Sequence, residues 1–196
     1  MIIDGTVGII STANFTYSAF TSNRDLGVTT TVPAEIDDLE GIFDADWRDE
    51  PTLLVDTLVL SPTNARALMS GLVASAKQRI DVYAEEMYDD SMVTAFIAAE
   101  RQGVTVRILV PPSNDADQGA QIDRLLAGGV DVRYLDSPTL HAKMILVDNR
   151  HVFVGSQNMS ANSIEHNREV GLILSEAANV SRLAKVFQRD FMTVSA

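Results

Sequence analysis

The amino-acid sequence repeats weakly at an interval of 144 residues, and this repeat limits the possible folds more than any other feature of the chain. Residues 1–28 align without a gap with residues 145–172, and the alignment continues through a helix-like pattern to residue 47. Nine of the 47 aligned positions are identical, whereas roughly three would be expected by chance from typical composition. The identical pairs include Asp4 and Asp148, Asn14 and Asn158, Asn23 and Asn167, Arg24 and Arg168, and Gly27 and Gly171. The chain is therefore expected to contain two related structural units.

The length of the repeat predicts how the two units divide the chain. If one copy is about 144 residues long, residues 52–196 form one complete copy and residues 1–51 form the C-terminal third of a preceding copy. We expect either that a parent sequence continues upstream of Met1 or that the front of the first copy has been lost.

Strand-like and helix-like segments alternate along the complete copy, which predicts an α/β fold. Helices are predicted at 34–48, 91–103, 117–129 and 177–191, with another that begins at Ser61-Pro62. The predicted strands are 7–12, 24–32, 79–86, 104–110, 130–135, 140–148, 151–156 and 168–174. We therefore expect a mixed, mostly parallel sheet flanked by helices, an α/β/α sandwich, with an antiparallel pair around the tight connection at Asn149-Arg150.

Composition excludes several classes of protein. The chain has no cysteine, so disulfide scaffolds, zinc ribbons and thiol nucleophiles are excluded. Its net charge of −12, from 15 basic and 27 acidic residues, disfavours nucleic acid as a partner. No apolar run is long enough to span a membrane, and the N-terminus lacks the features of a signal peptide. The absence of both favours a cytoplasmic location.

Residues 141–171 carry the residue types that phosphoryl chemistry requires. His141 and Lys143 are two residues apart on a predicted strand, so both side chains are expected on one face. Ser156 and Asn158 end the next strand and are expected to point toward the same place. A nucleophile, a cation and two neutral hydrogen-bond donors that converge on one spot suit a tetrahedral or trigonal-bipyramidal anion.

The same segment resembles the phospholipase D superfamily, whose signature is His-x-Lys, four residues, Asp, and then a Gly-Ser-x-Asn strand. His141, Lys143, Asp148, Ser156 and Asn158 match it in order. The resemblance covers 52–196 as one half of the usual two-motif molecule and 1–51 as the tail of the other half. It implies metal-independent phosphodiester hydrolysis or transfer through a covalent phosphohistidine, without a cofactor.

The resemblance also implies a role for each residue. His141 would attack phosphorus, or would protonate the leaving oxygen if the other motif's histidine is the nucleophile. Lys143 and Asn158 would hold the non-bridging oxygens, and Ser156 would donate near the same phosphate. Glu169 would accept a hydrogen bond from the far ring nitrogen of His141 and orient the ring.

Asp148 has a different expected role, because it would make structural hydrogen bonds at its turn and at the interface between the halves.

The preceding copy retains the residues that would support a first site. These are Thr12, Asn14 and Asp25, which align with Ser156, Asn158 and Glu169. Its histidine and lysine would fall before Met1. Three outcomes follow: a homodimer that brings two His141 residues together, a first-half chain that completes the site, or a remnant that turns over little.

Two substrate classes and one non-catalytic role remain open. Phospholipid head groups are favoured by the acidic composition. A phosphodiesterase acting on nucleic acid would need a basic rim, for which the candidates are Arg107, Arg133, Arg150 and Arg168. A non-catalytic interaction module is the third possibility. Glu85-Glu86, at the carboxyl end of a predicted strand, are a candidate acidic pair on the substrate side, and the loop 111–119, which follows a predicted strand, is a candidate for the border of the site.

Overall fold

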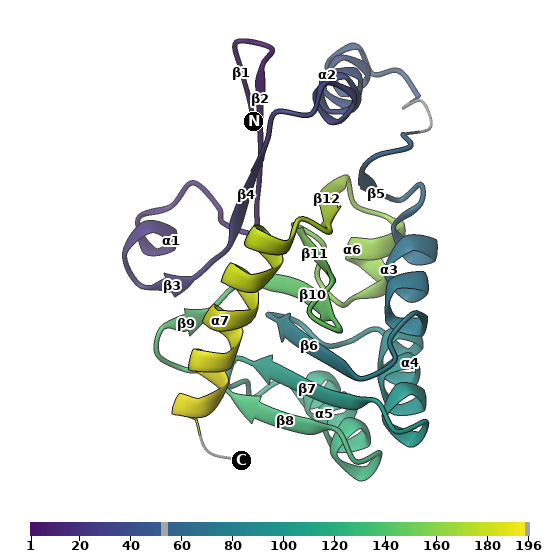
Figure 1. The fold of residues 1–196 in the computed structure, drawn as a ribbon, viewed down its shortest axis with the longest axis vertical. Coiled ribbons are helices and arrows are strands. Elements are labelled where there is room, and N and C mark those ends of the chain that lie inside the picture. The colour runs from purple at the N-terminus through teal and green to yellow at the C-terminus, as the bar shows by residue number, and fades with distance from the viewer. Residues whose placement is uncertain (52–54, 195–196) are drawn as a thin grey trace.

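The computed structural model describes residues 1–51 and 55–194, and its core is one seven-stranded sheet (Figure 1). The strand order in this sheet is β5-β12-β11-β10-β6-β7-β8, with a separate β1-β2-β4 sheet and a β3-β9 pair. The strands are β1 (Ile2–Ile3), β2 (Val7–Ser11), β3 (Asn23–Arg24), β4 (Gly27–Thr30), β5 (Val59–Ser61), β6 (Arg79–Ala84), β7 (Thr105–Val110), β8 (Asp131–Tyr134), β9 (Thr139–Leu140), β10 (Lys143–Val147), β11 (His151–Gly155) and β12 (Glu169–Leu174). The helices are α1 (Tyr17–Thr21), α2 (Pro33–Arg48), α3 (Ala65–Ala74), α4 (Asp90–Arg101), α5 (Ala116–Ala127), α6 (Ala161–Glu165) and α7 (Ala177–Thr193).

The mixed sheet flanked by helices confirms the predicted fold class. Strands β6, β7 and β8 pair in parallel. Strand β10 is antiparallel to β6 and β11, and β12 is antiparallel to β11 and β5. Five of the seven strands therefore run in one direction, but most neighbouring pairs are antiparallel. The sheet is thus mixed with most strands parallel in direction, as expected, and the antiparallel pairs arise because β10 and β12 each separate two strands of the opposite direction.

Helices cover both faces of the sheet (Figure 1). Strand alternation divides the apolar side chains between two cores. Ile145 and Val147 face a core that includes residues of α3, α4 and α5. Met144 and Leu146 face the opposite core, which includes Phe187 of α7. No helix among the described residues is long and apolar enough to cross a membrane.

The N-terminal segment repeats the geometry of the β10–β11 hairpin. Ile2 pairs with Gly8 across β1 and β2, and Leu146 pairs with Val152 across β10 and β11. Ile2 and Leu146 are 144 residues apart in sequence, and so are Gly8 and Val152. Asp4 and Asp148 also have the same left-handed backbone conformation, with φ of 49° and 53°. The repeat seen in sequence thus extends to register and turn conformation.

Helix α2 packs this segment onto the main sheet. Its residues Leu39 and Ile42 share a core with Ile10 of β2 and Leu172 of β12. This contact buries the apolar side of a short sheet that would otherwise be exposed to water.

Three local predictions differ from the structure. The helix predicted at Ser61-Pro62 begins at Ala65, because Asn64 Oδ1 accepts from the backbone N–H of Leu60 at 2.7 Å and holds a turn there. The predicted strand 140–148 is interrupted at His141 and Ala142. Helices α1 and α6 were not expected, since each has only five residues.

Short side chains provide the start signal of both unexpected helices. Thr16 and Ser160 each accept a backbone N–H bond three residues later, at 3.4 Å.

Candidate active site

Several strand ends gather the candidate residues at one edge of the main sheet. Lys143, the first residue of β10, pairs with Ala84, the last residue of β6. Gly155, the last residue of β11, pairs with Gly171 near the start of β12. The residues that flank these ends therefore emerge at the same edge.

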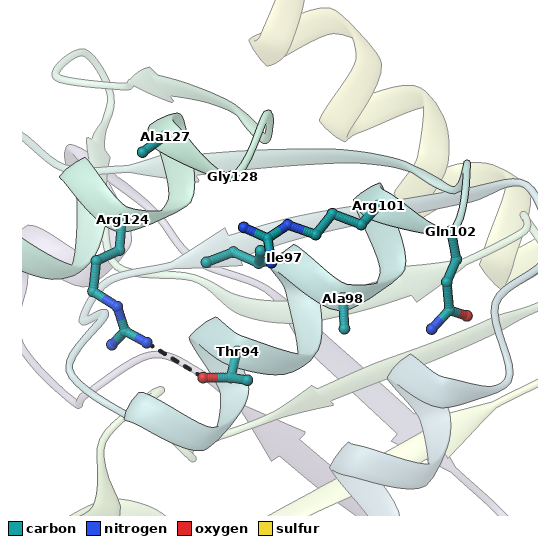
Figure 2. Close-up of a pocket in the computed structure, with 8 residues that line it drawn as sticks. All are labelled: Thr94, Ile97, Ala98, Arg101, Gln102, Arg124, Ala127 and Gly128. Atoms are coloured by element: carbon teal, nitrogen blue, oxygen red, sulfur yellow. Dashed lines mark hydrogen bonds between the residues drawn. The ribbon is translucent and has the colours of Figure 1, made fainter.

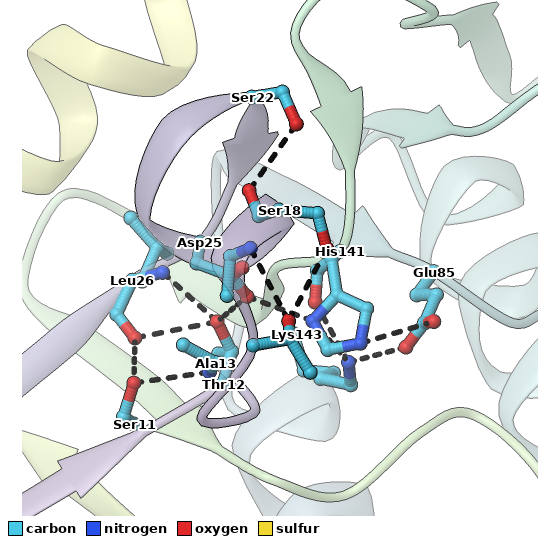
Figure 3. Close-up of polar contacts among 12 residues, drawn as sticks. Ser11, Thr12, Ala13, Ser18, Ser22, Asp25, Leu26, Glu85, His141 and Lys143 are labelled. Carbon is cyan, nitrogen blue, oxygen red and sulfur yellow. Dashed lines mark hydrogen bonds and ion pairs between the residues drawn. The ribbon is translucent and has the colours of Figure 1, made fainter.

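His141 is held by the N-terminal segment. Its backbone N–H donates to the carbonyl of Arg24 at 3.1 Å, beside the parallel β3–β9 pair. Its Nδ1 lies 2.8 Å from Asp25 Oδ1, and the same oxygen accepts from Thr12 Oγ1 at 2.7 Å (Figure 3). The Asp25 side chain is only 9% exposed. A buried carboxylate on Nδ1 fixes the ring orientation and leaves Nε2 facing Glu85.

The predicted hydrogen bond between Glu169 and His141 is wrong. Asp25 occupies one ring nitrogen of His141, and Glu85 lies beside the other at 3.3 Å. Glu169 instead accepts from Ser163 Oγ at 3.2 Å and from Asn167 Nδ2 at 3.4 Å. The orienting acid of His141 thus comes from the N-terminal segment, at the position that aligns with Glu169, 116 residues from His141 in sequence.

Lys143 lies beside His141, as the sequence predicts. Its Nζ donates to the carbonyl of His141 at 2.7 Å and lies 3.3 Å from His141 Nδ1. Its side chain is 4% exposed, so its charge must be compensated locally. The compensation comes from Glu85, whose Oε2 accepts a hydrogen bond from Nζ (Figure 3). The sequence indicates Glu85 only as one member of an acidic pair at the carboxyl end of a predicted strand, and it does not predict the contact with Lys143.

Ser156 and Asn158 follow β11 at the same edge. Ser156 Oγ accepts from the backbone N–H of Val170 at 3.1 Å. The backbone N–H of Asn158 donates to Ser163 Oγ at 2.9 Å, and its side-chain Oδ1 is buried without a hydrogen-bond partner in the part of the chain that the structure describes. Neither side chain makes a hydrogen bond to His141 or Lys143 within that part. Asn14 is exposed in the loop between β2 and α1.

Asp148 lies at the far end of β10 from Lys143. Its carboxylate accepts the backbone N–H bonds of Lys77, Gln78 and Arg79, each at 2.8 Å. Burial raises the pKa of Asp148, but these hydrogen bonds outweigh burial and lower the pKa below its usual value. The predicted turn contact is therefore present, whereas the predicted place at the interface between the halves is wrong.

Two reciprocal ion pairs join residues 1–51 to the rest of the chain. Arg24 Nε lies 2.5 Å from Asp190 Oδ2, and Arg168 Nε lies 3.0 Å from Asp46 Oδ1. Each arginine is aligned with the other at an offset of 144, and so is each aspartate. An arrangement in which residue i of one unit contacts residue j of the other, and the reverse, is that of a twofold interface.

A buried network lies beneath His141. Asp190, whose side chain is 5% exposed, accepts from the Tyr83 hydroxyl at 2.7 Å as well as from Arg24. Burial and the hydrogen bond to Asp190 raise the pKa of Tyr83, so the phenol remains a donor. Because Arg24 precedes Asp25, this network also fixes the segment that orients His141.

A separate hollow of about 560 Å³ lies between α4 and α5 (Figure 2). It is lined by Thr94, Ile97, Ala98, Arg101, Gln102, Arg124, Ala127 and Gly128. Arg124 donates to Thr94 Oγ1 across it at 3.3 Å. The lining has neither a nucleophile–base pair nor a carboxylate, so His141 and Lys143 remain the candidate site. Over residues 1–51 and 55–194, no cluster of three His, Cys, Asp or Glu side chains is arranged to hold a metal.

Comparisons with known proteins show the family of the chain. Residues 1–47 and 69–191 match the family model described as "Cardiolipin synthase, PLD-like domain". Cardiolipin synthase A of Pectobacterium carotovorum is 32% identical over 135 residues, which cover 66% of this chain and 28% of that protein. Cardiolipin synthase A of Yersinia pseudotuberculosis is 30% identical over 136 residues, with 67% and 28% covered. The chain thus spans 28% of the length of these curated relatives.

Solved structures have the same fold. The phospholipase D family member Nuc from Salmonella typhimurium superposes with a TM-score of 0.65 at 23% identity, covering 70% of this chain and 94% of that one. A phosphatidylserine synthase from Haemophilus influenzae gives 0.74 at 11% identity, covering 96% and 60%. With the family model matching most of its length, the chain belongs to the phospholipase D superfamily, in the family of cardiolipin synthase PLD-like domains.

Proposed function

We propose that the chain carries one half of a phosphodiester transferase or hydrolase site that acts on phospholipid head groups. The observation that carries the proposal is the pairing of His141 Nδ1 with buried Asp25, with Lys143 alongside. This is the arrangement of a nucleophile oriented by a third group.

The proposed reaction has two steps. The Nε2 lone pair of His141 attacks phosphorus, a P–N bond forms, and the P–O bond to the leaving alcohol breaks. Water or an acceptor alcohol then attacks phosphorus and loses its proton to a general base, while the P–N bond breaks and its electron pair returns to His141. Lys143 stabilises the non-bridging oxygens, and we assign the same role to Asn158 and a donor role to Ser156.

When the leaving group is an ordinary alcohol, the reaction needs an acid to protonate the leaving oxygen. The reciprocal contacts of Arg24 with Asp190 and of Arg168 with Asp46 support an internal twofold relation. Under that relation, Glu169 is the counterpart of Asp25, so it would orient the histidine of the other half as Asp25 orients His141. We therefore propose that Glu169 faces the histidine of a second His-x-Lys pair, supplied by a polypeptide segment outside residues 1–196.

This interpretation disfavours a homodimer of two complete copies. Residues 1–51 already contact the second copy through Asp25 and Arg24, so they take up the surface that a second His141 would have to approach. Complementation by a first-half segment leaves these contacts in place.

Phospholipid is the proposed substrate because the curated relatives are cardiolipin synthases. The arginines that a nucleic-acid interface would use are largely committed elsewhere. Arg107 pairs with Asp81, Arg133 with Asp131, and Arg168 with Asp46. Their charge is neutralised within the protein, so it is not free to bind a phosphate backbone.

A p-nitrophenyl phosphodiester tests His141 without the second motif, because p-nitrophenolate departs without a proton. We expect the full chain, in EDTA, to release a burst of about one p-nitrophenolate per chain. His141→Ala should abolish the burst. His151→Ala is the matched control, since His151 is exposed at the opposite end of the sheet and should leave the burst intact. A chain without a burst, or a burst that survives in His141→Ala, would contradict the proposal.

A further inference from the structure

Glu85 contacts the two groups that would contact the substrate in the proposed function, Lys143 Nζ and His141 Nε2. One carboxylate oxygen accepts from Lys143 Nζ, and the other lies 3.3 Å from His141 Nε2 (Figure 3). These are the cation that would hold a non-bridging oxygen and the nitrogen that would attack phosphorus. The carboxylate therefore lies where the phosphoryl group must approach.

The backbone keeps Glu85 at this position. Glu85 directly follows Ala84, and Ala84 pairs in register with Lys143. The Glu85 side chain is 27% exposed, so it can turn away from Nε2 when a ligand enters, but its Cα stays beside Lys143. The negative charge of Glu85 therefore stays close to the negative charge of an anion that binds at Lys143.

The charges around the site make ligand binding sensitive to the Glu85 carboxylate. Two carboxylates, those of Asp25 and Glu85, contact the His141–Lys143 pair. Lys143 is nearly fully buried, so solvent screens its interaction with Glu85 poorly. A ligand with two negative charges is repelled about twice as strongly by Glu85 as a ligand with one.

We propose that Glu85 is a specificity-determining residue that makes the site select singly charged phosphodiesters over doubly charged phosphomonoesters. The inference rests on the proposed function, because it assumes that the phosphoryl group binds at Lys143 and His141. It extends that function by naming the charge of the phosphoryl group accepted. A diester substrate would bind, whereas the phosphomonoester of the same alcohol would be rejected.

The test compares dimethyl phosphate with methyl phosphate, which differ by one methyl group and one charge. At about pH 8 the monoester is doubly charged, since its second pKa is about 6. Binding of each ligand to the full chain is measured by ³¹P NMR titration. Glu85→Gln removes the charge and keeps the shape. Glu86→Gln is the matched control, because it removes the same charge one residue away.

We expect Glu85→Gln to bind methyl phosphate about tenfold more tightly and dimethyl phosphate less than about threefold more tightly. Glu86→Gln should leave both affinities within about twofold. Glu85→Ala repeats the test without an amide, and the urea midpoint of each variant verifies folding. Lys143→Ala should weaken binding of both ligands.

Two other results are informative in different ways. If Lys143→Ala weakens binding but Glu85→Gln changes both affinities equally, weakens them or leaves them unchanged, the role of Glu85 is overturned and the proposed function stands. If neither ligand binds the wild type or any variant, both proposals are overturned.

Discussion

At the scale of single residues, the orientation of His141 depends on a carboxylate that comes from a distant part of the chain. Asp25 Oδ1 lies 2.8 Å from Nδ1 and is itself held by Thr12. In the proposed reaction, the carboxylate would fix the tautomer and stabilise the charge that develops on the ring during attack. Loss of the Asp25 carboxylate is therefore expected to lower the rate of reaction without changing the fraction of chains that react.

Asp25→Asn tests this role. We expect the rate constant of the p-nitrophenolate burst to fall by about a hundredfold or more, with its amplitude unchanged. Stopped-flow absorbance measures both quantities. Asp37→Asn, an exposed position on α2, is the control and should change neither. An unchanged burst rate in Asp25→Asn would contradict the assignment of the orienting acid.

Asp148 has a structural role that depends on pH. Its folded pKa lies below the usual value of 3.8, so its contribution to stability is complete above that value and is lost as the pH falls through the folded pKa. Asp148→Asn removes the charge that three backbone N–H groups share, and it should cost about 2 kcal/mol near pH 7.

Urea unfolding of wild type and Asp148→Asn from about pH 7 to about pH 3 measures this contribution. The stability difference should stay constant down to about pH 5 and shrink below about pH 4. A difference that grows as the pH falls would exclude the predicted role.

The sequence predicted His141 and Lys143 because alternation along a strand places side chains two residues apart on one face. It could not predict that Asp25 orients His141, since Glu169 is nearer in sequence and nothing local indicates that the acid comes from the N-terminal segment. Glu85 was noticed only as an acidic residue after a strand. Its contact with Lys143 depends on β6 and β10 being neighbours, and their pairing is set by the whole sheet.

At the scale of elements, the site edge depends on a close approach between β11 and β12. Gly155 and Gly171 face each other, and a Cβ on Gly155 would lie 2.7 Å from the Cα of Gly171. A Cβ on Gly171 would overlap the ring of Phe153. The absence of side chains lets the two strands carry Ser156 and Glu169 to the same edge.

Gly171→Ala is expected to destabilise the fold by about 2 kcal/mol, because the ring of Phe153 must move within a packed core. Gly71→Ala is the contrasting change, since its Cβ meets nothing within 4 Å in α3. It should stabilise the chain by up to about 1 kcal/mol through helix propensity. Chemical denaturation compares the two, and equal effects would refute the packing argument.

The elements themselves were largely predictable, because long apolar periods mark α2, α4, α5 and α7. The sequence failed where local side chains decide the conformation. Asn64 holds a turn that delays α3, and Thr16 and Ser160 begin helices too short to show a period. The predominance of antiparallel pairs was missed because strand order is a property of the complete sheet.

At the scale of the whole molecule, two ion pairs that are equivalent in the 144-residue alignment join residues 1–51 to the rest of the chain but differ in burial. The Asp190 side chain is 5% exposed and binds both Arg24 and Tyr83. The Asp46 side chain is 40% exposed and pairs with Arg168. The pair at Asp190 should therefore contribute more to the free energy of unfolding than the equivalent pair at Asp46.

Asp190→Asn is expected to cost about 3 kcal/mol, since it removes a buried charge that the half-buried Arg24 and the buried Tyr83 hydroxyl both contact. Asp46→Asn should cost less than about 1 kcal/mol, as solvent-exposed pairs do. Urea unfolding of the two variants measures the difference. Similar costs would show that the two contacts do not differ as their burial indicates.

The central claim is that His141 forms a covalent bond to phosphorus, and mass spectrometry of the quenched reaction with a p-nitrophenyl phosphodiester tests it most directly. The account predicts one phosphoryl-ester adduct per chain, on the peptide that contains His141, labile in acid and absent from His141→Ala. An adduct on another residue, or release of p-nitrophenolate with no adduct at any time point, would contradict it.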